Sequence, residues 1–234
     1  MTPAPAGGIS LRSGPMGRSQ LVYRALEAMQ QPEQATVIAL HGRNGALDDL
    51  VPLARMLGPR VRVFAPEAAR GVYDGLALVS HTWFGLRADG QPEPASFGDS
   101  LFQLEQFVYD VVDRAPARDA RRLPLLLGYD QGAVLALTAA TVIPDFLGGV
   151  MAVCGFLPTI PGWNSPIERS DGLPVLLVGD PRDSESTTRI QESGERLRGR
   201  GADVTAVEVE GARLLGEQLG SALRAWLAGT TTTS

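Results

Sequence analysis

The chain has very little cysteine and histidine, the residues that disulfide-bonded proteins and many metalloproteins require. Cys154 is the only cysteine among 234 residues, so no intrachain disulfide can form, and a reducing compartment is compatible with this composition. The only two histidines, His41 and His81, lie far apart in the sequence, and neither a metal-ligand cluster nor a phosphate-binding loop is present. We therefore expect no metal site and no cofactor.

Long apolar runs and dense basic runs are also missing. No stretch approaches the roughly 20 continuous apolar residues of a membrane span, and residues 1–18 lack the apolar centre of a signal peptide. The formal net charge is −5 without a basic cluster, so neither nucleic acid nor an anionic membrane surface is a predicted partner. We expect a cytoplasmic protein, either a monomer or a homodimer.

The remaining composition predicts one folded domain. Apolar residues make up 44% of the chain, which suffices for one well-buried core at this length. The Pro/Gly-rich start and the Thr-rich end are typical of loose termini. We predict a single domain over residues 20–228, between flexible segments at 1–19 and 229–234.

Short apolar runs alternate with amphipathic stretches along the chain. The apolar runs suit parallel strands that are covered on both faces, and they lie at Leu21–Glu27, Thr36–Leu40, Val61–Ala65, Leu123–Leu127, Gly148–Val153, Pro174–Val178 and Val204–Val209. Helical spacing predicts helices over Leu47–Leu57, Ser100–Ala115, Gln131–Val142, Thr187–Arg198 and Leu214–Leu227. This order predicts an α/β fold, a three-layer sandwich whose doubly wound sheet is mostly parallel, with sites at the carboxyl ends of the strands.

The first loop at such a strand end is His41-Gly42-Arg43-Asn44-Gly45. Its glycines allow a sharp turn with inward-facing N–H groups, which suits an oxyanion hole at Gly42 and Arg43. A plain glycine-rich turn between a strand and a helix is the alternative interpretation.

The second loop, Gly128-Tyr129-Asp130-Gln131-Gly132, joins a strand to a helix of small residues. This layout is typical of a nucleophile elbow, whose central side chain projects above the sheet at the start of the helix. Asp130 stands at the centre, where an esterase needs serine, and Gln131 follows as a further candidate for the oxyanion hole.

The third loop follows the strand at 174–178 and carries Asp180 and Asp183. The acid of a hydrolase triad lies at such a strand end, which makes Asp183 a candidate. Alternatively, Asp180 opens a turn with Pro181, and Asp183 or Ser184 caps the next helix.

From about Gln20 to Leu227, the order and spacing of motifs resemble the phospholipase/carboxylesterase branch of the α/β-hydrolases, which includes acyl-protein thioesterases. The motifs are HGRNG, APEAARG, the Trp83-Phe84 pair, GYDQG, VCGFLP, VGDPRD and VEVEGARL. The resemblance implies an α/β-hydrolase fold, assigns the triad acid to Asp183, and places His41, His81, Trp83, Phe84 and Phe156 around the pocket.

Two positions depart from the family pattern. Asp130 replaces the serine of Gly-x-Ser-x-Gly, and Gly211-Ala212 replaces the Gly-His pair that precedes the final helix. The histidine deficit is independent of that alignment, because His41 and His81 both precede the elbow, whereas this fold presents nucleophile, acid and histidine in that order. Serine esterase turnover, which needs both a hydroxyl and an imidazole, is not expected.

Three hypotheses follow for function. The leading one is a homologue with a degenerate triad that binds a small molecule, neutral or cationic because Asp130 places a negative charge in the pocket. The second is a hydrolase that uses Asp130 as nucleophile or base on an epoxide, halide or lactone. The third is a serine esterase that engineered substitutions at Asp130 or Ala212 have inactivated.

Overall fold

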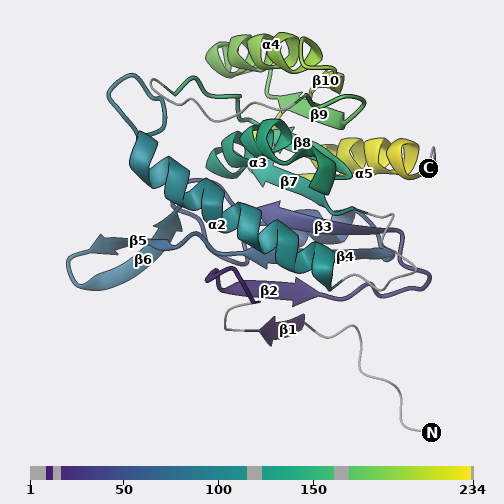
Figure 1. Cartoon of the computed structure of the whole chain (residues 1–234), viewed down its shortest axis with the longest axis horizontal. Coiled ribbons are helices and arrows are strands. Elements are labelled where there is room, and N and C mark those ends of the chain that lie inside the picture. Colours follow the sequence, from purple (N-terminus) through teal and green to yellow (C-terminus); the bar gives the residue numbers. More distant parts are fainter. Residues whose placement is uncertain (1–8, 13–16, 115–122, 161–168, 233–234) are drawn as a thin grey trace, which may run out of the picture.

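An eight-stranded sheet forms the centre of the chain, seen in a computed structural model that describes residues 9–12, 17–114, 123–160 and 169–232 (Figure 1). Its strand order is β1-β2-β4-β3-β7-β8-β9-β10. The strands span Ile9–Arg12 (β1), Tyr23–Leu26 (β2), Ala35–Leu40 (β3), Val61–Pro66 (β4), Leu125–Tyr129 (β7), Gly149–Val153 (β8), Pro174–Gly179 (β9) and Asp203–Glu208 (β10). The β1–β2 and β2–β4 pairs are antiparallel, and all other neighbours pair parallel. The mostly parallel α/β sheet is confirmed.

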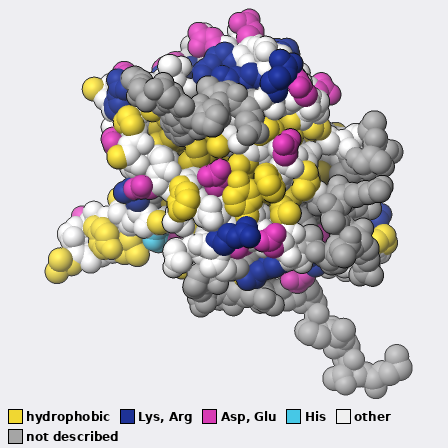
Figure 2. Space-filling view, in the orientation of Figure 1, with side chains coloured by type: hydrophobic (Ala, Val, Ile, Leu, Met, Phe, Trp, Pro, Cys, Tyr) yellow, Lys and Arg dark blue, Asp and Glu magenta, His cyan; other side chains and the backbone are white. Residues whose placement is uncertain are grey.

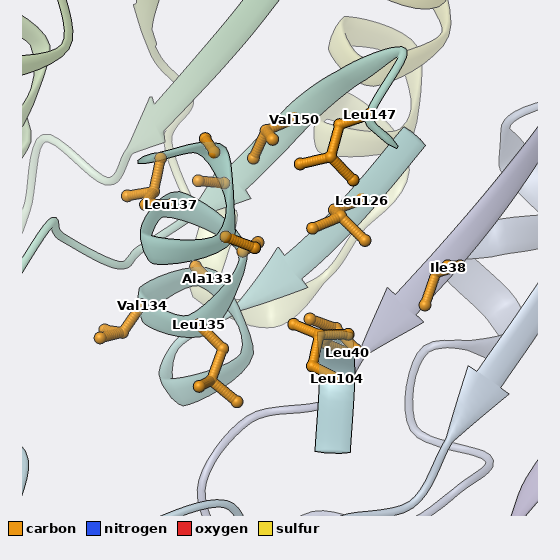
Figure 3. Close-up of a cluster of buried hydrophobic side chains, with 14 of the residues drawn as sticks. Ile38, Leu40, Leu104, Leu126, Ala133, Val134, Leu135, Leu137, Leu147 and Val150 are labelled. Carbon is orange, nitrogen blue, oxygen red and sulfur yellow. The ribbon is translucent and has the colours of Figure 1, made fainter. Parts of the chain in front are cut away.

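Helices cover both faces of the sheet, as predicted. They span Val51–Met56 (α1), Pro94–Asp113 (α2), Gln131–Val142 (α3), Ser184–Arg198 (α4) and Glu217–Thr232 (α5), with 3₁₀ turns at Pro144–Phe146 (η2) and Ala212–Leu214 (η3). One core lies beneath α2, α3 and α4 (Figure 3), and the other lies beneath α1 and α5. Adjacent residues of β3 enter opposite cores, with Ile38 in the first and Val37 in the second.

Several boundaries differ from the sequence prediction, and local chemistry explains two of them. α1 begins at Val51 rather than Leu47 because Pro52, which lacks an N–H, sits in its first turn. α2 begins six residues earlier than predicted because the carboxylate of Glu93 accepts the N–H groups of Ala95 and Ser96. Residue 115, the predicted end of this helix, lies outside the described residues.

The fold also extends beyond the predicted domain of residues 20–228. Strand β1 pairs with the edge of β2, which satisfies backbone groups that this edge would otherwise expose. Helix α5 continues to Thr232, and the hydroxyl of Thr230 donates to the carbonyl of Trp226 one turn earlier. The described sheet and helix thus reach into both segments that the sequence predicted to be flexible.

A two-stranded hairpin was not predicted. It consists of β5 (Arg70–Asp74) and β6 (Ala77–Thr82), and it projects from the body at the end where the parallel strands terminate (Figure 1). The space-filling view shows apolar side chains on it (Figure 2), and Leu76 at its tip is fully exposed. The Asp74-Gly75 pair between apolar runs is a hairpin signal in the sequence.

Candidate functional site

Asp130 lies in the sharp turn between β7 and α3, with φ 50° and ψ −115°. A residue with a Cβ pays a conformational cost at positive φ, so the packing around the turn must hold it there. A Cβ at Gly128 would lie 2.3 Å from the carbonyl oxygen of Gly132, and one at Gly132 would lie 2.1 Å from that of Leu40. Both glycines are therefore required by the close approach of helix and strand, as in a nucleophile elbow.

The loop after β3 lies directly against this turn. A Cβ at Gly42 would lie 2.8 Å from the ring of Tyr129 and 3.3 Å from the Cβ of Asp130. The N–H of Arg43 donates to Oδ2 of Asp130 over 2.9 Å. An amide predicted for an oxyanion hole therefore binds the carboxylate of the chain itself.

The side chain of Gln131 is buried and makes structural hydrogen bonds. Only 3% of the residue is exposed, and its Oε1 accepts from the hydroxyl of Thr82 and from the N–H of Trp83 at 2.8 and 3.0 Å. Its Nε2 donates to the carbonyl of Phe84 over 2.9 Å. The side chain joins the end of β6 and the two residues after it to the start of α3. Its backbone N–H lies in the first turn of that helix.

His41 is buried and supports the loop from beneath. Its Nε2 accepts from the N–H of Ala68 over 3.0 Å, so the ring proton sits on Nδ1, which donates to the carbonyl of Gly42 over 2.8 Å. Burial lowers the pKa of His41, which favours the neutral ring. Both ring nitrogens are thus engaged away from Asp130.

His81 belongs to β6 and pairs with a different carboxylate. Its Nδ1 lies 3.2 Å from Oε1 of Glu67, and its backbone exchanges two hydrogen bonds with Gly45. Across the described residues, no hydrogen bond or ion pair joins either imidazole to Asp130.

The predicted pocket aromatics occupy two environments. Trp83 and Phe84 are 0% and 2% exposed, and both belong to the core beneath α2, α3 and α4. The indole N–H of Trp83 donates to the carbonyl of His41 over 2.8 Å. Phe156 is half-buried, and the guanidinium of Arg189 lies 4.7 Å from its ring centroid.

The two aspartates after β9 shape the start of α4. Asp183 caps the helix, since its Oδ1 accepts from the N–H of Ser186 over 3.0 Å, and its Oδ2 pairs with Arg213. The Ser186 amide and then the Arg213 guanidinium lower the pKa of Asp183. Asp180 is buried and opens the turn, with its carboxylate accepting from the N–H of Arg182 over 3.1 Å. The capping and turn roles considered from the sequence are both present.

Ala212 opens the 3₁₀ turn η3 and is fully buried in the core beneath α1 and α5. The preceding Gly211 has φ 72°, so the chain turns sharply after β10. Arg213, which sequence reasoning missed, reaches Asp183 with its side chain, and its carbonyl accepts from the hydroxyl of Tyr129 over 3.2 Å. The only feature of the sequence that could have pointed to Arg213 is its position next to Ala212.

Cys154 directly follows β8 and lies close to these charges. It is 6% exposed and has φ 53°. Burial raises the pKa of its thiol to about 11, and the nearby aspartates reinforce this against the opposing Arg213. Within the described ranges, no group of three or more Cys, His, Asp or Glu side chains is arranged to hold a metal ion.

Comparison with known proteins places this geometry in a family. A model of the phospholipase/carboxylesterase family matches residues 22–180, which is more than half of the chain. The chain belongs to this family. The match includes the loop after β3, the elbow and the end of β9.

Solved structures share the fold of this family member. A carboxylesterase from Mesorhizobium loti superposes with a TM-score of 0.78 at 20% identity, covering 96% of this chain and 100% of the other. The Bacillus cereus carboxylesterase gives 0.71 at 17% identity and covers 90% and 94%. Esterase PE8 gives 0.67 at 22% identity and covers 93% and 98%. These similarities establish the α/β-hydrolase fold.

A search of curated proteins returned no match. Among the helices that the structure describes, none combines the length and the apolar character needed to cross a membrane.

Proposed function

We propose that this family member has a degenerate triad and binds a small molecule without ordinary serine esterase turnover. The hydrogen bond from the Arg43 N–H to the Asp130 carboxylate carries the proposal. In a serine esterase, such an amide stabilises the oxyanion of the substrate. Here the chain's own carboxylate takes that bond, and the side chain at this position has no hydroxyl to attack an ester.

The surroundings of the two histidines support the same conclusion. Acylation needs an imidazole within hydrogen-bond reach of the nucleophile. His41 is held between Ala68 and Gly42, His81 pairs with Glu67, and the position assigned to the triad histidine is a buried alanine, Ala212. Both imidazoles of the chain are therefore committed to partners other than the elbow.

Ester hydrolysis tests this proposal. With p-nitrophenyl acetate and butyrate, we expect the wild type and Asp130→Ala to give equal rates, close to that of buffer. Asp130→Ala frees the Arg43 amide but supplies neither a nucleophile nor a base, so it should not raise the rate. Robust turnover that Asp130→Ala abolishes would overturn the proposal.

The charges around the site favour a neutral or cationic ligand. Asp183 is neutralised by Arg213, and Arg189 pairs with Glu185, whereas Asp130 accepts only a backbone amide among its described contacts. A ligand that binds the folded state raises the melting temperature. We expect tetramethylammonium, but not acetate or phosphate, to raise it in the wild type, and Asp130→Asn to remove the shift. An equal shift by acetate would contradict this ligand class.

The position of Asp130 at the centre of the elbow also favours a second candidate, a hydrolase in which this carboxylate attacks carbon. Attack at a saturated carbon would expel bromide or open the C–O bond of the epoxide or lactone ring, and it would leave an ester on Asp130. This ester would persist, because both imidazoles are engaged elsewhere. Mass spectrometry after incubation with styrene oxide, 1,2-dibromoethane and a γ-lactone would then find an adduct on the Asp130 peptide. An unmodified peptide with all three probes would count against this candidate.

A further inference from the structure

Both oxygens of Asp183 are occupied. Oδ1 accepts from the Ser186 amide at the start of α4, and Oδ2 pairs with the Arg213 guanidinium. In a working triad, the acid gives one oxygen to the Nδ1–H of the histidine. In this chain the oxygen that does not cap α4 pairs with Arg213 instead.

Arg213 is held in place from its backbone as well as from its side chain. The hydroxyl of Tyr129, the residue before Asp130, donates to the carbonyl of Arg213 over 3.2 Å. The N–H of Ala212, immediately before it, donates to the carbonyl of Val209 over 3.1 Å. The 3₁₀ turn η3 is thus tied to the elbow and to the end of β10, which aims the guanidinium at Asp183.

The other charged groups around this pair have their own partners or carry negative charge. Arg182 pairs with Glu210, and Arg189 pairs with Glu185. The remaining titratable groups that interact electrostatically with one another or with Arg213 are Asp130, Asp180, Tyr129 and Cys154. The charge of Arg189 also favours the ionised form of Asp183, but Arg213 is the cation in direct contact with it.

We infer that Arg213 has taken over the triad acid from the missing histidine, and that it blocks a histidine–acid pair in addition to the absence of an imidazole at position 212. A guanidinium stays protonated at every relevant pH and has no acceptor, so it fills the partner site of Asp183 without any capacity for base catalysis. Restoring the histidine alone would leave it beside a cation and without its carboxylate.

Histidine titration by NMR tests this inference without depending on activity. In Ala212→His, the new imidazole stands on the residue next to Arg213, and we expect this like charge to lower its pKa. In Ala212→His with Arg213→Leu, Asp183 is released to accept from the imidazole. We expect the pKa of the introduced imidazole to rise by about one unit or more, a tenfold change in its protonation equilibrium.

Two controls isolate the effect. Arg182→Leu removes an arginine of the neighbouring loop that pairs with Glu210, so in the Ala212→His background it is expected to leave the pKa of the new imidazole unchanged. Asp183→Asn added to the Arg213→Leu variant is expected to reverse the rise. Equal pKa values with and without Arg213 would overturn the inference.

A second measurement avoids position 212, where a larger side chain must enter the core. Carboxyl ¹³C titration of Asp183 in the otherwise native chain is expected to give a pKa about one unit higher in Arg213→Leu than in the wild type. Arg182→Leu again serves as the control, and no change in Arg213→Leu would also overturn the inference.

The inference rests on the proposed function for two assignments, of Asp183 to the triad acid and of position 212 to the lost histidine. The two fail in different experiments. Wild-type ester turnover would overturn the proposed function, whereas an unchanged titration of Asp183 would overturn the role of Arg213 alone.

Discussion

At the scale of single residues, the site is shaped by what each polar group already binds. The Arg43 amide binds Asp130, Arg213 binds Asp183, and the His41 ring bridges Gly42 and Ala68. Desolvation penalises a buried polar group without a partner, so these bonds keep the centre stable. The same bonds occupy an amide, a carboxylate and an imidazole that catalysis would need to be free.

The titration of His41 is a prediction at this scale. Because burial lowers its pKa, we expect His41 to remain neutral, with the proton on Nδ1, at pH 6.5, where an ordinary histidine is half protonated. The unfolded chain takes up the proton near that pH and the folded chain does not. The free energy of unfolding should therefore decrease as the pH falls below 6.5.

Two measurements check this expectation. Nitrogen-15 NMR of the ring reports the tautomer and the pKa, and half-protonation at or above pH 6.5 would contradict it. Urea unfolding at pH 7.5 and 5.5 reports stability, and His41→Gln should lose less stability between these two values than the wild type.

At the scale of elements, the elbow is the most constrained segment. Asp130 is held at positive φ between a strand and a helix whose backbones nearly touch at Gly128 and Gly132. This contact fixes where the Asp130 carboxylate stands, because α3 cannot move away from β3 and β7 without losing the core shown in Figure 3.

A pair of glycine substitutions tests this constraint. Gly132→Ala should destabilise the protein by at least about 2 kcal/mol, because the new Cβ would lie 2.1 Å from the Leu40 carbonyl oxygen. Gly98→Ala is the matched control in α2, where a Cβ meets no atom within 4 Å, and it should stabilise by about 0.5–1 kcal/mol. Denaturant unfolding measures both, and equal effects would refute the steric argument.

At the scale of the whole molecule, the sheet separates two cores. Ile38 points from β3 into the core beneath α2 and α3, and Leu223 packs from α5 into the opposite core. Both side chains are fully buried. Substitutions on opposite faces share no cavity, so their effects should be independent.

A double-mutant cycle checks this independence. Ile38→Val should cost about 0.5–1.5 kcal/mol and Leu223→Ala about 2–5 kcal/mol. The double variant should cost their sum within about 0.5 kcal/mol in urea unfolding. A larger interaction energy would show that strain crosses the sheet.

Much of the fold followed from local patterns. Continuous apolar runs located β3, β7, β8 and β9 within two residues, and the predicted bounds of α3 are those observed, because period and turn chemistry are properties of neighbouring residues. The hairpin of β5 and β6 escaped prediction because its side chains are largely exposed and lack the pattern of a buried strand.

The sequence by itself determined which groups are missing, since no arrangement of this chain supplies a serine at position 130 or a histidine after the elbow. Only the tertiary structure decided what fills those roles. The bond between Arg43 and Asp130 spans 87 residues, and the pair of Arg213 with Asp183 spans 30. The parallel sheet brings the carboxyl ends of strands that are distant in sequence to one edge, and this is why these partners lie together. No local sequence pattern predicts such long-range contacts.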